Sequence, residues 1–154
     1  MTDLRDAAAI PRPVLVLGFA GLLPPLAGLW LLVLAGGGVE AGALFTAIFA
    51  YSALIFSFVG GTWWGLSSAA GRTPGRGDLL LAVAPSLAAF LCLPLVGGYG
   101  PQGGVLLAVL ILLSPAVDMR FVRAGLAPRW WMRLRVPLSV GLSTLLGGAI
   151  WLVG

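Results

Sequence analysis

Asp118 and Arg135 are the two side chains of this sequence best placed to act together inside an apolar protein. Gly125 is a natural end for one helix and Pro128 a natural first-turn residue for the next, so a helical hairpin should turn between them. Asp118 lies seven positions before this glycine. Arg135 lies seven positions after this proline, so the two should be at the same depth. Because an unpaired carboxylate there is costly, we predict an Asp118–Arg135 ion pair.

Two further arginines, Arg133 and Arg120, are alternative partners for Asp118. In one interpretation the ion pair is a structural staple that fixes the hairpin. In the other it is an anion or lipid-headgroup site, where the surplus arginines bind phosphate and Asp118 orients one of them. The sequence leaves both interpretations open.

The other side chains that usually carry catalysis or bind metals are scarce. The chain has no histidine, one cysteine (Cys92) and five acidic residues. Catalysis of the Ser-His-Asp or Cys-His type needs an imidazole base, and transition-metal and haem sites rely mainly on His and Cys ligands. We therefore expect no metal, no cofactor and no enzymatic activity, with Asp118 as the one acid–base group near the bilayer.

Aromatic residues fall near both ends of the predicted apolar segments. The group near one end is Trp63, Trp64, Trp130 and Trp131, and the group near the other is Trp30, Tyr99 and Trp151. Amphipathic rings at such positions are typical of anchoring at the membrane interface, which is our first interpretation. The alternative for the first group is a role in stacking on a hydrophobic ligand.

Small residues recur every four positions at Ser57, Gly61 and Gly65, in a series that extends to Ala53 and Ala69. On a helix this spacing gives one nearly axial stripe without bulky side chains, and Gly61-x-x-x-Gly65 is a GxxxG motif. We expect the stripe to pack against another helix of the same chain. A homodimer interface is the main alternative.

These residues must be positioned by helices that cross a membrane. Of 154 residues, 60% are hydrophobic and 9% charged, against about a quarter charged in a soluble domain. Each apolar stretch reaches the about 20 residues that a crossing needs. We predict an all-α, polytopic membrane bundle in one domain, residues 13–154, after a cytoplasmic tail, residues 1–12. The expected helices cover 13–35, 42–69, 79–96, 104–124 and 129–153.

All nine basic residues are arginines, and their distribution predicts the topology. They lie in the N-terminal tail and in the connections 71–78 and 120–135, whereas the connections 36–41 and 97–103 carry none. By the positive-inside rule the N-terminus is cytoplasmic and the C-terminus outside. The charges do not distinguish two crossings in 79–117 from a re-entrant hairpin. Since they serve topology, we expect no nucleic-acid partner.

Two motifs resemble the signatures of a membrane-protein family called domain of unknown function 3429. Residues 57–65 match the pattern S-F-x-G-G-x-x-W-G, and Asp118 with residues 125–138 matches D…G-x-x-P-x-W-x-x-x-L-R-x-P-L. The resemblance implies a bacterial inner-membrane protein with a mitochondrial relative, and it implies no activity. Members of the family often carry His or Arg where Trp63 stands, a departure that argues against a titrating group at this position.

Two functions therefore remain open. The first is a non-enzymatic scaffold or accessory subunit that packs through its small-residue helices with itself or with a larger membrane complex. The second is a binder or carrier of a lipid, quinone or other hydrophobic ligand near Trp63, Trp64, Asp118 and Arg135. Both place the chain in a lipid bilayer.

Overall fold

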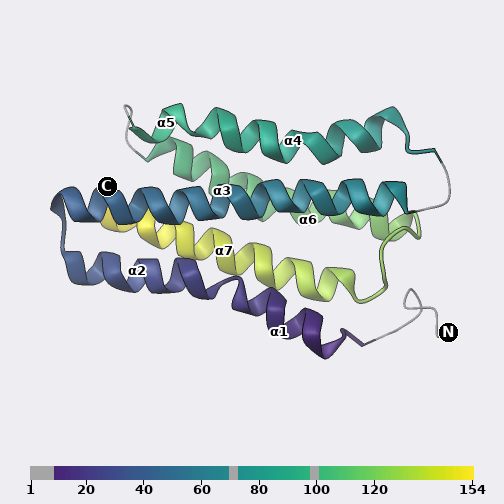
Figure 1. Ribbon diagram of the computed structural model, residues 1–154, viewed down its shortest axis with the longest axis horizontal. Helices are drawn as coiled ribbons and strands as arrows, with labels where there is room; N and C mark the ends of the chain where they lie inside the picture. The colour runs from purple at the N-terminus through teal and green to yellow at the C-terminus, as the bar shows by residue number, and fades with distance from the viewer. Residues whose placement is uncertain (1–8, 70–72, 98–100) are drawn as a thin grey trace.

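The computed structural model describes residues 9–69, 73–97 and 101–154, and within these ranges it contains helices and no strand. Figure 1 shows the helices running alongside one another as an elongated bundle. In chain order they are α1 (Arg12–Ala20), α2 (Leu23–Ala35), α3 (Gly38–Ser68), α4 (Arg76–Cys92), α5 (Pro94–Gly97), α6 (Gln102–Arg123) and α7 (Trp131–Val153). Helices suit a bilayer because they satisfy every backbone polar group internally.

The helices form five segments long and apolar enough to cross a membrane, which confirms the prediction. They are α1 with α2, α3, α4 with α5, α6, and α7. The segment Arg76–Val96 has 21 residues, and its length of about 31 Å matches the hydrocarbon thickness of about 30 Å. Figure 1 shows α4 and α5 following α3 along its length, which favours two crossings in 79–117 over a re-entrant hairpin.

Two helices begin three or four residues earlier than the sequence predicted. α3 begins at Gly38 instead of residue 42, and α4 begins at Arg76 instead of residue 79. Their first turns contain Glu40 and Asp78 respectively. A carboxylate in the first turn is favoured by the unpaired backbone N–H groups of a helix N-terminus, so a charged residue was a poor marker of a helix boundary here.

Prolines interrupt two of the spans. The first span breaks at Gly21 and Leu22, and Pro24 follows in the first turn of α2. The third span breaks at Leu93, directly before Pro94. Proline lacks the N–H that continues a helix, whereas it fits a first turn, where that N–H has no partner.

The core lies around α3, which contacts α2, α4, α6 and α7. Its phenylalanines Phe45, Phe49 and Phe56 are buried against residues of α6 and α7 such as Leu107 and Leu146. A second, smaller cluster lies nearer the C-terminal end of α3, where Val59 and Trp63 pack with Ala82, Phe121 and Ala127. This second cluster positions the site described below.

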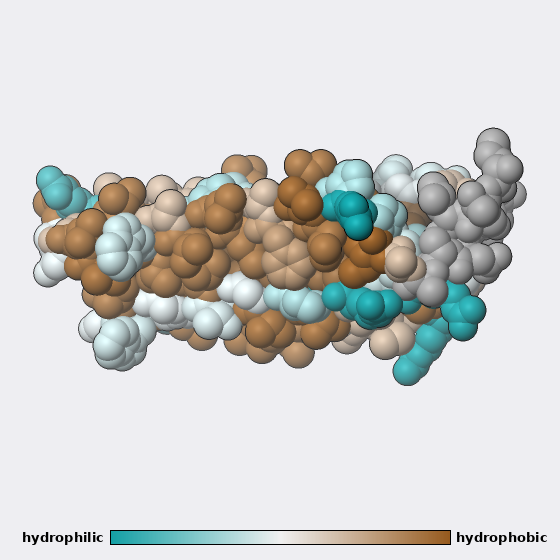
Figure 2. Space-filling model, turned by 90° about the horizontal axis from the view of Figure 1, so that it is seen from below, coloured by the Kyte–Doolittle hydropathy of each residue, from teal (hydrophilic) through white to brown (hydrophobic). Residues whose placement is uncertain are grey.

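The outer surface is apolar along most of its length, as a lipid-facing surface should be. Figure 2 shows a broad hydrophobic band, with hydrophilic side chains gathered mainly toward one end. Residues such as Leu54, Phe58 and Leu80 are exposed. At the arginine-rich end α1, α4 and α7 begin and α3 and α6 end, and the exposed arginines there are Arg12, Arg76, Arg120, Arg123, Arg129 and Arg133.

α1 begins at the arginine-rich end, and α7 ends at the opposite one (Figure 1). Five crossings require this arrangement. Which end faces the cytoplasm stays a prediction. Of the residues used to predict the topology and the anchors, Arg5, Arg72 and Tyr99 lie outside the described residues, as does most of the predicted tail.

Candidate functional site

Asp118 of α6 is fully buried, and both of its carboxylate oxygens accept hydrogen bonds. Arg135 Nε of α7 donates to Oδ2 over 2.8 Å, so the ion pair expected from the spacing is present. The indole Nε1 of Trp63 on α3 donates to Oδ1 over 2.9 Å, and that of Trp131 on α7 over 2.8 Å. Three helices therefore meet at one carboxylate.

The connection between α6 and α7 sets this geometry. Gly125 adopts φ +69°, the left-handed conformation that ends helices and favours glycine. The chain then forms a turn in which Trp131 N donates to Pro128 O over 3.0 Å. Trp131 and Arg135 are four residues apart on α7, so they lie on the same face and both reach Asp118.

The hydrogen bonds of the pair hold the carboxylate in one orientation. The carboxylate receives three N–H donors, one of them a guanidinium, and charge-assisted hydrogen bonds of this kind are stronger than neutral ones. Together Asp118 and Arg135 carry no net charge, which lowers the cost of burying either one. Because the side chain of Arg135 is only 11% exposed, loss of its partner would leave a buried charge uncompensated.

A chain of hydroxyl groups continues from the guanidinium. Arg135 Nη2 donates to Ser114 Oγ over 3.2 Å, and Ser114 Oγ donates to the backbone oxygen of Ile111 over 2.8 Å. Pro115 lacks the N–H that this oxygen would otherwise accept, so Ser114 satisfies a carbonyl that the proline frees. Ser139 Oγ lies 3.4 Å from Ser114 Oγ.

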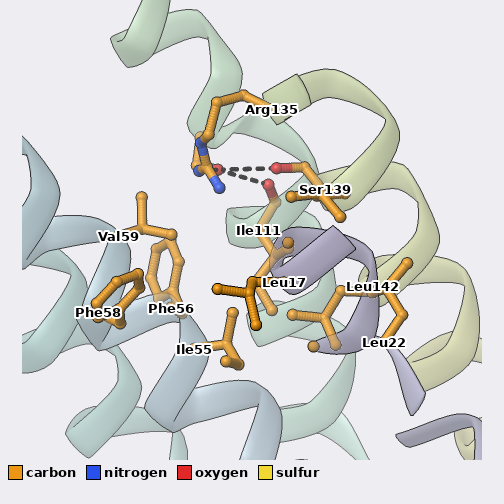
Figure 3. Close-up of a pocket in the computed structure, with 14 residues that line it drawn as sticks. Leu17, Leu22, Ile55, Phe56, Phe58, Val59, Ile111, Arg135, Ser139 and Leu142 are labelled. Carbon is orange, nitrogen blue, oxygen red and sulfur yellow. Dashed lines mark hydrogen bonds between the residues drawn. The ribbon is translucent and has the colours of Figure 1, made fainter. Parts of the chain in front are cut away.

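The guanidinium also borders a cavity of about 180 Å³ among α1, α3, α6 and α7. Figure 3 shows Arg135 and Ser139 at one end of it and apolar side chains such as Leu17, Ile55 and Leu142 around the rest. Leu17 is 73% exposed, so the cavity is bordered by the lipid-facing surface.

A second cavity of about 190 Å³ lies among α3, α4 and α6. Phe56 and Ser114 border both cavities, and Trp63 borders the second. The second cavity has no charged residue in its lining. Over the described part of the chain, no group of three or more His, Cys, Asp or Glu side chains is placed to hold a metal ion.

The structure does not bring Arg120 or Arg133 to Asp118 in place of Arg135. Arg120 Nη2 instead lies 3.0 Å from Asp78 Oδ1 on α4, with side chains 59% and 9% exposed. Arg120 stands two residues after Asp118, so a rotation of about 200° directs it to the other side of α6. Arg133 stands two residues before Arg135 and is exposed on α7.

The interfacial interpretation is wrong for Trp63, whose indole N–H binds Asp118 inside the bundle. The indole N–H of the partly buried Trp131 binds the same carboxylate. Trp63 is buried and stacks on Phe121, with ring centroids 6.4 Å apart. Trp130 is buried too, and its Nε1 has no hydrogen-bond partner among the residues that the structure describes. Trp64 is 49% exposed and keeps the exposure that an anchor needs.

The sequence analysis missed three components of the site. The indole donors could have been expected from one signal, because an indole N–H only donates and a buried carboxylate only accepts. Ser114 carried a weaker signal, its position directly before Pro115. No signal in the sequence indicated Asp78 as the partner of Arg120, because this contact depends on how α4 and α6 are rotated about their axes.

The small-residue stripe packs within the chain in its first part, where Ala53 packs on the core and Ser57 Oγ lies 2.7 Å from Ser86 Oγ of α4, but its glycines do not. A Cβ atom added at Gly61 or Gly65 would meet no atom within 4 Å, and both residues are exposed. The close approach to α4 occurs one residue earlier, at Gly60, where a Cβ would meet the backbone oxygen of Ala82 and the Pro85 ring. The prediction that Gly61 and Gly65 pack within the chain is therefore wrong. The side of α3 that meets α4 is rotated by about 100° from the predicted side.

Comparisons with known proteins show what this chain is similar to. A family model described as "Protein of unknown function (DUF3429)" matches residues 10–151. The chain is 30% identical to Transmembrane protein 69 of Xenopus tropicalis in an alignment of 154 positions that covers 96% of this chain and 58% of that protein. The chain thus spans less than two thirds of this relative's length. No solved structure matches.

Proposed function

Since this chain belongs to DUF3429, a family of proteins of unknown function, we propose its role from its own site: it binds a hydrophobic ligand in the cavity beside Arg135. The protein is a non-enzymatic, multi-pass membrane protein, and we place it in the bacterial inner membrane with its arginine-rich end in the cytoplasm. The observation that carries the proposal is a guanidinium, held by a buried carboxylate, at the end of an otherwise mainly apolar cavity.

The site has the composition of a binding site for an amphipathic molecule. Such sites are mainly apolar with a few fixed polar groups that orient the ligand. Here Asp118 and Ser114 fix the guanidinium, so its orientation does not have to be established when the ligand binds. The cavity is smaller than the about 300 Å³ of a site for a drug-sized ligand, which favours one acyl or isoprenoid chain.

Filling the cavity tests this function. Ile55 lines the cavity, whereas the neighbouring Leu54 is 69% exposed on the lipid-facing side of α3. We expect protein purified in mild detergent to retain a lipid or quinone enriched over bulk lipid, detected by lipidomics and absorbance. Ile55→Trp should lose that species and Leu54→Trp should keep it. Retention of bulk lipid alone by the wild type would contradict the proposal.

A second candidate function, a scaffold or accessory subunit, is supported by the open face of α3. Gly61 and Gly65 are exposed with free space around them, so the backbone of another helix could approach closely. In this function the partner is a second copy of the chain or a larger membrane complex. A protein that stays monomeric in mild detergent would count against it.

A further inference from the structure

We infer that the molecule held beside Arg135 carries an uncharged carbonyl oxygen, as in the acyl ester of a lipid or the ring of an isoprenoid quinone. This inference rests on the proposed binding function and names the chemical class of its ligand. The charge of the site, its hydrogen-bonding groups and its depth all favour this class.

The charge of the site disfavours an anion. The positive charge of Arg135 is already compensated by Asp118, whose oxygen lies 2.8 Å from Nε. Asp118 is fully buried, and a second charged pair, Arg120 with Asp78, joins α6 to α4 and is absent from the cavity lining. An anionic headgroup would therefore add an uncompensated negative charge to a neutral, buried site.

The hydrogen-bonding groups of the site call for an acceptor. A guanidinium carries five N–H bonds and accepts none. The Nε–H group donates a hydrogen bond to Asp118, and one Nη2–H group donates a hydrogen bond to Ser114. The other three N–H bonds have no partner in the described part of the chain. The hydroxyl hydrogen of Ser114 is already given to Ile111 O, so this hydroxyl accepts from Arg135 and does not compete for the ligand.

A carbonyl oxygen matches this arrangement best. Its two lone pairs can accept two N–H bonds, and it brings neither a charge nor a donor that would need its own acceptor. A plain hydrocarbon would fill the cavity and leave the N–H groups of Arg135 unsatisfied, which is unfavourable away from water.

The depth of the site agrees with such a group. Asp118 lies five residues before the end of α6 at Arg123, which places it about 8 Å inside the arginine-rich end. That depth corresponds to the boundary between the headgroup layer and the hydrocarbon of a bilayer. The apolar remainder of the cavity, along Ile55 and Leu142, then accommodates the chain attached to the carbonyl.

The test compares molecules that differ in their polar group. The protein is placed in nanodiscs of ether-linked phosphatidylcholine, which has no ester carbonyl. The probes, each added at a few mole per cent, are ¹³C-carbonyl methyl hexadecanoate, decylubiquinone, hexadecane and hexadecanoate. Thermal unfolding reports binding because a ligand that binds only the folded state raises Tm. Infrared spectra of the labelled ester report hydrogen bonds to its carbonyl.

We expect methyl hexadecanoate or decylubiquinone to raise Tm, with an affinity about tenfold higher than that of hexadecane, which corresponds to about 1.4 kcal/mol. The labelled carbonyl band should shift to lower wavenumber with the wild type and with Leu54→Trp, and not with Ile55→Trp. The larger effect of the two carbonyl probes identifies the source of the group as lipid ester or quinone.

The other outcomes separate the two proposals. If hexadecanoate raises Tm most, or if hexadecane raises it as much as the better of the two carbonyl probes, the ligand class is wrong and the binding function survives. If no probe raises the Tm of the wild type relative to Ile55→Trp, both proposals fail.

Discussion

At the scale of single residues, Asp118 is a fully buried carboxylate that accepts three N–H hydrogen bonds. Its carboxylate joins α3, α6 and α7 through Trp63, Trp131 and Arg135, all within 2.9 Å. A buried ion pair adds little net stability over apolar residues of similar volume, but removing one partner leaves a charge that nothing compensates. Removing one partner should therefore lower the free energy of unfolding strongly, whereas replacing both partners together should lower it much less.

Substitution of the largely buried Arg135 and of the exposed Arg120 tests how much the loss of a charged partner costs in stability. Arg135→Gln should lower the free energy of unfolding by about 3–5 kcal/mol, because it leaves Asp118 charged and buried. Arg120→Gln should cost about 0–1 kcal/mol, because Arg120 is 59% exposed and its pair with Asp78 is screened by solvent. Denaturant unfolding in detergent micelles measures both.

The double variant Asp118→Asn, Arg135→Gln serves as the control for charge. It removes both charges and should be at least about 1 kcal/mol more stable than Arg135→Gln alone. Equal losses for Arg135→Gln and Arg120→Gln would show that Asp118 does not depend on its buried partner.

At the scale of elements, the rotation of α3 decides which residues meet α4. Gly60→Ala should destabilise the protein by about 1–3 kcal/mol, because the new methyl group would clash with the backbone oxygen of Ala82 and force the helices apart. Gly61→Ala, one residue later in open space, should stabilise the helix by about 0.5–1 kcal/mol. Thermal unfolding of the two variants measures the difference, and the opposite order would refute this rotation of α3.

The same rotation explains what the sequence could predict. Apolar length and the arginine positions suffice for the five crossings, and the symmetric spacing around Gly125 and Pro128 suffices for the Asp118–Arg135 pair. The sequence does not predict which side of each helix faces the core. A helix with the core on one side and lipid on the other is apolar all round, so its periodicity marks no inner face. The contacts of Gly60, Trp63 and Asp78 depend on those faces, so they needed the structure.

At the scale of the whole molecule, charge and binding features collect at one end of the bundle. The Asp118 site, the Arg120–Asp78 pair and the exposed arginines lie where α1, α4 and α7 begin and α3 and α6 end. The opposite half is held by the phenylalanines of α3 and contributes stability. At the arginine-rich end, the exposed face of α3 around Gly61 and Gly65 leaves space for another transmembrane helix.

The oligomeric state tests that face. If the scaffold function is right, the protein in mild detergent should run as a dimer or larger species by light scattering, and Gly61→Leu should shift it to the monomer because a bulky side chain prevents close approach of a second helix. Gly42→Leu is a matched control, since Gly42 is also exposed on α3 with no atom within 4 Å of an added Cβ, but it lies near the other end. It should leave the oligomer intact. If both leucine variants dissociate alike, close approach at Gly61 is not what holds the copies together, and the binding function in the Arg135 cavity stands alone.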